Sequence, residues 1–239
     1  MKPAFLLAVV LLGLAVLVPG VARAGGPSLP LLRIVIVGDS TVCEWPEKDV
    51  RRGWGHFIQD YFQSEVKVIN LAKSGRSTKT FIKEGLWDAA LKEKPDFVLI
   101  QFGHNDSHAP EKPEATNAST TYKENLRRYI NETREVGATP ILVTPMCRRT
   151  FNPDGKLKDE LLPYANAMKE VAVEQKVGLI DLHTVSGELF QRLGPAGSAE
   201  LANAPDDQTH FNEKGARAMA KLVMKELPVV EPALHPYLN

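Results

Sequence analysis

Three residues of this chain have the types and the spacing that acyl transfer by a serine requires. Ser40 follows an apolar run, in a Gly-Asp-Ser-Thr segment at residues 38–41. A serine becomes a nucleophile only with a base beside it. Asp207 and His210 offer one, because an acid three residues before a histidine can meet the imidazole within one turn and leave the other ring nitrogen to accept the serine proton. Taken singly, each signal is weak. A capping serine in a turn explains the Gly-Asp-Ser segment equally well, and an Asp-x-x-His pair is common by chance.

Two further residues could stabilise the negative charge that forms on a carbonyl oxygen during such an attack. Gly75 lies in a Lys-Ser-Gly-Arg segment, and a glycine allows a backbone N–H to approach a ligand closely. Asn105 lies in a Gly-His-Asn-Asp segment, and its side-chain N–H could donate to a developing oxyanion. Gly75 alone would be read as a simple turn glycine.

Apolar runs and amphipathic segments alternate along the chain and predict where these residues lie in the fold. Strands buried on both faces are predicted at residues 32–37, 66–71, 97–102, 139–143 and 177–182, because their hydrophobicity is continuous rather than alternating. Helices are predicted at residues 56–63, 78–92, 122–135 and 161–176, and a last one opens at Asn212, a good N-cap. Surface loops are predicted at residues 106–119 and 194–205.

This alternation predicts a three-layer α/β/α fold of the flavodoxin-like type, with a five-stranded parallel sheet. In such a sheet, ligands bind outside the carboxyl ends of the strands. Ser40, Gly75 and Asn105 each follow a predicted strand, and His210 directly precedes the last helix. We therefore expect these residues to meet at one edge of the sheet.

The order serine, glycine, asparagine and Asp-x-x-His resembles the SGNH hydrolases, the GDSL-like esterase superfamily. The resemblance extends from residue 34 to the last helix. It implies Ser40 as nucleophile, His210 as general base and Asp207 as the acid that orients it. It also implies an oxyanion hole made of the Ser40 and Gly75 backbone N–H groups and the Asn105 side chain. Asp206 is an adjacent acid, and the Asp-x-x-His spacing favours Asp207 over it.

The residues within these motifs are similar to those of rhamnogalacturonan acetylesterases, which remove acetyl groups from the pectin backbone. The similar segments are Gly-Asp-Ser-Thr at 38–41, Gly-Trp-Gly at 53–55, Ala-Lys-Ser-Gly-Arg-Ser at 72–77 and Phe-Gly-His-Asn-Asp at 102–106. Trp45, Arg76 and His104 are candidate substrate-binding residues, since aromatic faces stack on sugars and arginine can meet a uronate carboxylate. For His104, a role in shaping the asparagine loop is the alternative.

The function predicted is a serine carbohydrate O-acetylesterase that acts on an acetylated polysaccharide or oligosaccharide through an acetyl-enzyme, without cofactor or metal. One alternative is an esterase of the same superfamily with another substrate: an acetylxylan esterase, a lysophospholipase or a thioesterase. The other is a non-catalytic carbohydrate-binding protein. Cysteine and histidine show no zinc-ligand spacing. The 29 Lys and Arg against 29 Asp and Glu give no basic block that would indicate nucleic-acid binding.

The N-terminus is predicted to be a secretory signal peptide at residues 1–24, followed by one SGNH hydrolase domain at 25–239. Lys2 precedes an apolar run at 4–18, and Ala-Arg-Ala at 22–24 offers a cleavage site. The alternative, a membrane anchor, needs about 20 apolar residues. We expect a secreted or periplasmic monomer with no stable membrane association after cleavage. An oxidising compartment permits, without requiring, a disulfide between Cys43 and Cys147.

Overall fold

Five parallel strands form the centre of the computed structural model, which describes residues 29–239. The strands are β1 (Leu32–Gly38), β2 (Val66–Asn70), β3 (Phe97–Gln101), β4 (Thr139–Val143) and β5 (Gly178–Ile180), in the spatial order β2-β1-β3-β4-β5. All neighbouring pairs are parallel, with Val35 opposite Ile69 on one side and opposite Val98 on the other. The predicted five-stranded parallel sheet is confirmed.

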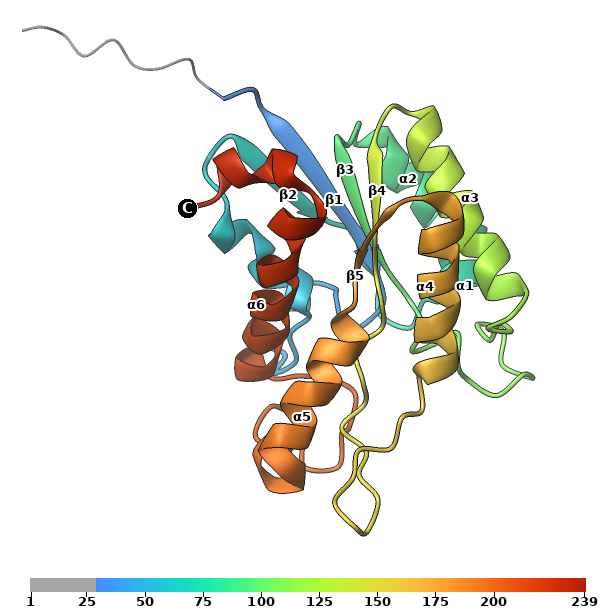
Figure 1. Cartoon of the computed structure of the whole chain (residues 1–239), viewed down its shortest axis with the longest axis vertical. Coiled ribbons are helices and arrows are strands. Elements are labelled where there is room, and N and C mark those ends of the chain that lie inside the picture. The colour runs from blue at the N-terminus through green and yellow to red at the C-terminus, as the bar shows by residue number, and fades with distance from the viewer. Residues whose placement is uncertain (1–28) are drawn as a thin grey trace, which may run out of the picture.

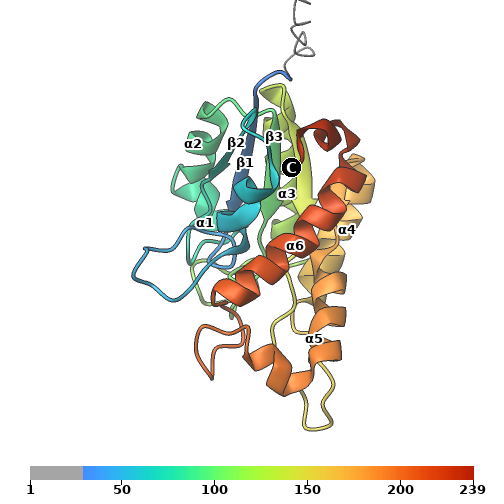
Figure 2. The same cartoon turned by 90° about the vertical axis from the view of Figure 1, so that its left-hand side faces the viewer.

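Helices cover both faces of the sheet (Figure 1). One layer contains α1 (Thr78–Lys83), α2 (Leu86–Lys92), α3 (Thr121–Glu135) and α4 (Leu162–Gln175); the other contains α5 (Leu182–Ala199), α6 (Glu213–Val230) and two short 3-10 helices, Trp54–Tyr61 and Pro232–Tyr237. Figure 2 looks onto α6, which lies in front of the sheet. The three-layer α/β/α architecture predicted from the sequence is confirmed.

The strands are mostly apolar because the central ones, β1, β3 and β4, contribute to two hydrophobic cores, one on each face of the sheet. Ile34 and Ile36 of β1 pack toward the α6 side, whereas Val35 and Val37 pack toward the α3 and α4 side, and all four side chains are fully buried. Side chains of a strand alternate between the two faces of the sheet, so a strand covered on both faces needs apolar residues at every position. The rigid ends of these strands then carry the loops that hold the polar residues.

Several predicted boundaries were wrong. The helix predicted at 78–92 is two helices, because Gly85 adopts a left-handed φ of 73° between them. Residues 194–199, predicted as loop, belong to α5, which is kinked at Gly194 and was not predicted at all. The segment predicted as a helix at 56–63 is a 3-10 helix, and the fifth strand is only three residues long. Asn212 caps α6 as predicted, accepting a hydrogen bond from the Gly215 N–H.

The predicted signal peptide at residues 1–24 lies outside the described residues. Within residues 29–239, no helix combines the length and the apolar character needed to span a membrane. Cys43 and Cys147 are both buried and both carry free thiols.

Candidate active site

The turn after β1 holds Ser40 in place. The Asp39 carboxylate accepts hydrogen bonds from the Thr41 backbone N–H at 2.9 Å and from its hydroxyl at 2.7 Å. The backbone N–H groups of Val42 and Cys43 both donate to the Asp39 carbonyl. Ser40 is thereby fixed on a short turn at the end of a buried strand, with only 6% of its surface exposed.

His210 bridges Ser40 and Asp207. The Ser40 Oγ and the His210 Nε2 are 2.9 Å apart, and the His210 Nδ1 is 2.8 Å from the Asp207 Oδ2. The other carboxylate oxygen of Asp207 accepts the backbone N–H groups of Thr209 at 2.8 Å and His210 at 2.7 Å. Desolvation raises the pKa of Asp207, but the hydrogen bonds from His210 and Thr209 outweigh it and lower this pKa below its ordinary value. Asp207 is therefore ionised at neutral pH, as an acid that orients an imidazolium must be.

The buried side chain of Arg149 holds the backbone of this Asp-x-x-His turn through hydrogen bonds. Its Nη2 donates to the carbonyl oxygens of Asp207 at 2.9 Å and His210 at 2.7 Å, and its guanidinium lies 4.3 Å from the centre of the Phe211 ring. Burial lowers the pKa of Arg149 to about 10, so the side chain stays charged at neutral pH. This role could not be found from the sequence, because nothing in the local sequence distinguishes Arg149 from the adjacent Arg148.

The three predicted oxyanion donors lie on loops that the sheet brings together. The segment after β2 continues alongside the end of β1, since the Lys73 N–H donates to the Gly38 carbonyl at 2.9 Å. Gly75 has a φ of 79°, a conformation that L side chains rarely adopt. Within residues 29–239, the N–H groups of Ser40 and Gly75 donate to no other protein group. Asn105 donates one side-chain N–H to the Arg76 carbonyl at 2.9 Å, which leaves its second N–H available.

Asp106 ties the asparagine loop to the start of α1. Its carboxylate accepts hydrogen bonds from the Thr78 hydroxyl and backbone N–H, and from the Thr116 hydroxyl at 2.9 Å. The carboxyl group is fully buried, and desolvation raises its pKa to about 6 despite these donors. The loop that carries Asn105 is therefore anchored by a group whose charge depends on pH near 6.

The three candidate substrate-binding residues have different surroundings. Trp45 lies beside Ser40 and His210: its Nε1 donates to the Ser40 carbonyl at 3.1 Å, and its ring meets the His210 ring edge-on at 6.0 Å. Arg76 forms an ion pair with Glu84 at 2.9 Å. His104 is 2% exposed, with its Nε2 3.3 Å from the Met146 Sδ, and burial lowers its pKa well below the ordinary value. Substrate contacts by these three residues stay predictions.

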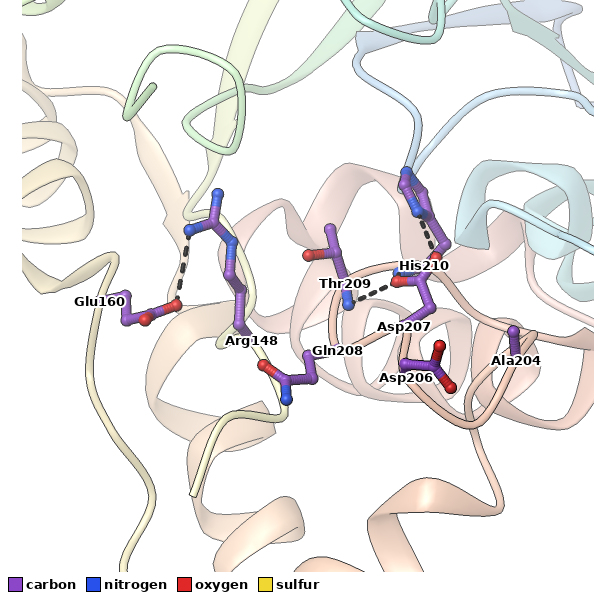
Figure 3. A pocket seen from close by; sticks show the side chains of 8 residues that line it. All are labelled: Arg148, Glu160, Ala204, Asp206, Asp207, Gln208, Thr209 and His210. Atoms are coloured by element: carbon purple, nitrogen blue, oxygen red, sulfur yellow. Dashed lines mark hydrogen bonds and ion pairs between the residues drawn. The ribbon is translucent and has the colours of Figure 1, made fainter. Parts of the chain in front are cut away.

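A hollow of about 560 Å³ opens beside His210 (Figure 3). Its lining residues are Arg148, Glu160, Ala204, Asp206, Asp207, Gln208, Thr209 and His210. All but Ala204 are polar or charged. Asp206 is exposed and points away from His210, whereas Asp207 contacts it (Figure 3), so the geometry separates the two adjacent acids. Among the described residues, the one cluster of three side chains that could hold a metal ion is Cys147, Asp159 and His183, which includes none of Ser40, Asp207 and His210.

The chain matches the model of the GDSL-like lipase/acylhydrolase family over residues 36–218. The chain belongs to this family. It is 39% identical over 197 residues to a probable rhamnogalacturonan acetylesterase of Bacillus subtilis (strain 168), YesY, covering 80% of this chain and 90% of the relative. It is 38% identical over 207 residues to the rhamnogalacturonan acetylesterase RhgT of the same strain, covering 80% and 88%. The predicted enzyme class, carboxylic ester hydrolase, is confirmed.

Solved structures of two bacterial proteins share the fold. The crystal structure of protein YxiM from Bacillus subtilis superposes with a TM-score of 0.74 at 30% identity, and covers 84% of this chain and 57% of that longer chain. An acetylxylan esterase from Geobacillus stearothermophilus superposes with a TM-score of 0.66 at 20% identity, and covers 83% of this chain and 94% of that one. The second likeness supports the fold alone.

Proposed function

We propose that this chain is a serine carbohydrate O-acetylesterase that deacetylates rhamnogalacturonan through an acetyl-enzyme, with Ser40, His210 and Asp207 as its catalytic residues. The observation that carries the proposal is the continuous chain of contacts from the Ser40 Oγ through His210 to Asp207. The choice of sugar rests on the two relatives at 38–39% identity, whose names specify rhamnogalacturonan.

In the first half of the reaction, the Ser40 Oγ attacks the acetyl carbonyl carbon while the His210 Nε2 accepts the hydroxyl proton. The carbonyl oxygen becomes an oxyanion and accepts hydrogen bonds from the Ser40 and Gly75 N–H groups and from Asn105. The bond to the sugar oxygen then breaks, and the imidazolium of His210 gives its proton to that oxygen.

In the second half, His210 takes a proton from water, which attacks the acetyl-enzyme, and acetate leaves as Ser40 regains its proton. Asp207 stays ionised throughout and stabilises the imidazolium. The low pKa that its hydrogen bonds maintain is consistent with this role.

The hollow beside His210 favours a carbohydrate over a long acyl chain, because Ala204 is the single apolar residue in its lining. Arg148 also lines it, whereas Arg149 is buried and neither Arg149 nor Arg76 is among the lining residues. We propose that Arg148 meets the carboxylate of a uronic acid, since a guanidinium offers a bidentate fork. Its present partners are the His104 carbonyl at 3.1 Å, the Ser107 hydroxyl at 3.2 Å and the Glu160 carboxylate at 3.5 Å.

The decisive experiment is acetate release from acetylated rhamnogalacturonan, homogalacturonan and xylan at equal acetyl concentration, with wild type and Ser40→Ala. We expect the highest kcat/KM on rhamnogalacturonan and loss of nearly all activity in the variant on every substrate. Equal rates on the three polymers would reject rhamnogalacturonan as the specific substrate but would leave the assignment of esterase activity intact. Wild-type turnover by Ser40→Ala would reject the mechanism.

Arg148→Gln separates uronate recognition from catalysis. We expect KM on acetylated rhamnogalacturonan to rise about tenfold, the value of one charged hydrogen bond, while kcat/KM on an aryl acetate stays unchanged. Equal effects on both substrates would show that Arg148 acts on the reactive groups and not on the sugar.

We further propose that residues 1–24 are a signal peptide and that the enzyme works in the periplasm or outside the cell, where a polysaccharide substrate is found. N-terminal sequencing of the protein recovered from those fractions should begin near Gly25. An N-terminus at Met1 or Lys2 in the active fraction would contradict this.

A further inference from the structure

Three side chains that could bind a metal meet where β4 and the loop after it reach the start of α5. Cys147 lies just beyond β4, Asp159 lies on the following loop, and His183 is the second residue of α5. The Cys147 Sγ is 3.6 Å from the His183 Nε2, which in turn is 3.0 Å from the Asp159 Oδ1. One ligand atom from each residue lies within 4.8 Å of the other two.

We propose that Cys147, Asp159 and His183 form a Zn²⁺-binding site. Zinc bonds of about 2.3 Å to sulfur and about 2.0 Å to nitrogen or oxygen, at tetrahedral angles, place sulfur and nitrogen about 3.5 Å apart and nitrogen and oxygen about 3.3 Å apart. The observed separations, 3.6 and 3.0 Å, lie within a few tenths of an ångström of those values. Thiolate and imidazole select zinc over calcium and magnesium, which take oxygen ligands.

Two of the three ligands are held in place by the surrounding backbone. The His183 N–H donates to the Thr144 hydroxyl at 2.8 Å, and the Cys147 N–H donates to the Ser186 hydroxyl at 3.0 Å. Because both backbones are fixed, an ion would meet two preorganised side chains instead of having to order them. This lowers the entropic cost of binding.

The burial of the three ligands indicates how an ion would enter the site, and their charges would neutralise it. Cys147 and His183 are buried, whereas 40% of the Asp159 side chain is exposed, so an ion reaches the pair by way of the carboxylate. On binding, the Cys147 thiol loses its proton to solvent, and one thiolate and one carboxylate neutralise the two charges of the ion. Water fills the fourth coordination position.

A metal here would stiffen one wall of the hollow beside His210. Arg148 and Glu160, which both line that hollow, are the direct chain neighbours of Cys147 and Asp159. An ion bound to Cys147, Asp159 and His183 would therefore connect to α5 the two chain segments that contain Arg148 and Glu160. The proposal does not rest on the esterase function, and binding can be measured without substrate.

The test uses the folded protein after removal of metal with a chelator, titrated with Zn²⁺ and, separately, with Co²⁺. We expect one Zn²⁺ per chain by elemental analysis, and a Tm rise of about 5–10 °C at a hundredfold excess of free Zn²⁺ over Kd. Co²⁺ should give a thiolate-to-cobalt charge-transfer band in wild type and no such band in Cys147→Ser.

Asp159→Asn should weaken Zn²⁺ binding at least tenfold, and because this side chain is half-exposed the variant should fold. Asp154→Asn is the matched control, since Asp154 is an exposed acid on the same loop that pairs with Lys156, and it should bind as wild type does. The proposal fails if wild type retains no stoichiometric Zn²⁺, if Asp159→Asn binds as tightly as wild type, or if the Co²⁺ complex lacks the thiolate band.

Discussion

Replacing Asp207 by Asn tests the proposed role of this acid with little change in shape. One oxygen of Asp207 accepts two backbone N–H groups, and the other accepts the His210 Nδ1–H. The amide of Asn has one acceptor and one donor, so only one of its two orientations keeps the two backbone hydrogen bonds. In that orientation its NH₂ faces the His210 Nδ1, which must then give up its proton in order to accept.

The Asp207→Asn substitution therefore places the imidazole proton on Nε2, which faces the Ser40 Oγ at 2.9 Å. A protonated Nε2 cannot accept the serine proton. The same substitution in the serine protease template lowers kcat about 10⁴-fold, which corresponds to about 5.4 kcal/mol of transition-state stabilisation. We expect a loss of this size here, and we expect it in kcat, because both carboxylate oxygens of Asp207 are hydrogen-bonded to Thr209 and His210.

Steady-state hydrolysis of an aryl acetate at pH 7.5 gives kcat and KM directly, and Asp206→Asn serves as the control. Asp206 is an exposed neighbour of the same charge that makes no hydrogen bond to His210, so its variant should retain wild-type kcat. A loss of less than tenfold in Asp207→Asn, or equal losses in both variants, would refute the assignment of Asp207.

Two further predictions concern the asparagine loop. Asn105→Ala removes one proposed oxyanion donor, so kcat on an aryl acetate should fall about 10²–10³-fold with little change in KM, whereas an unchanged kcat would remove Asn105 from the oxyanion hole. Burial raises the pKa of Asp106 from 3.8 to about 6, so the folded state binds more protons than the unfolded state between these values, and stability falls as pH rises through them. Urea unfolding should show wild type losing about 2 kcal/mol relative to Asp106→Asn between pH 4 and pH 6.5, and parallel pH curves for the two proteins would contradict the shift.

The sheet was predictable because its central strands are buried on both faces. Residues 32–37 and 139–143 are apolar at every position but one or two, and β1 and β4 lie where those runs indicated. Parallel strands end at one edge, so the order of the polar segments also predicted that they would meet. The break between α1 and α2 was missed because a helical pattern tolerates Gly85, and only the folded chain reveals its left-handed φ.

The parts of the site that sequence could not supply depend on contacts between distant segments. Arg149 and Arg148 are adjacent and chemically identical, yet one is buried beneath the Asp207 turn and the other lines the hollow. Cys147 and His183 come from different elements and show no ligand spacing in the chain, so their proximity appears only once β4 and α5 are packed.

The central claim, that Ser40 is the nucleophile, is tested most directly by mass spectrometry of the acyl-enzyme. Acid quenching of enzyme mixed with a rapidly reacting aryl acetate should yield a single peptide that contains Ser40 and carries one acetyl group on that residue. Ser40→Ala should yield no acetylated peptide and almost no acetate. An acetyl group that accumulates transiently on another residue, or turnover by Ser40→Ala at the wild-type rate, would contradict the account.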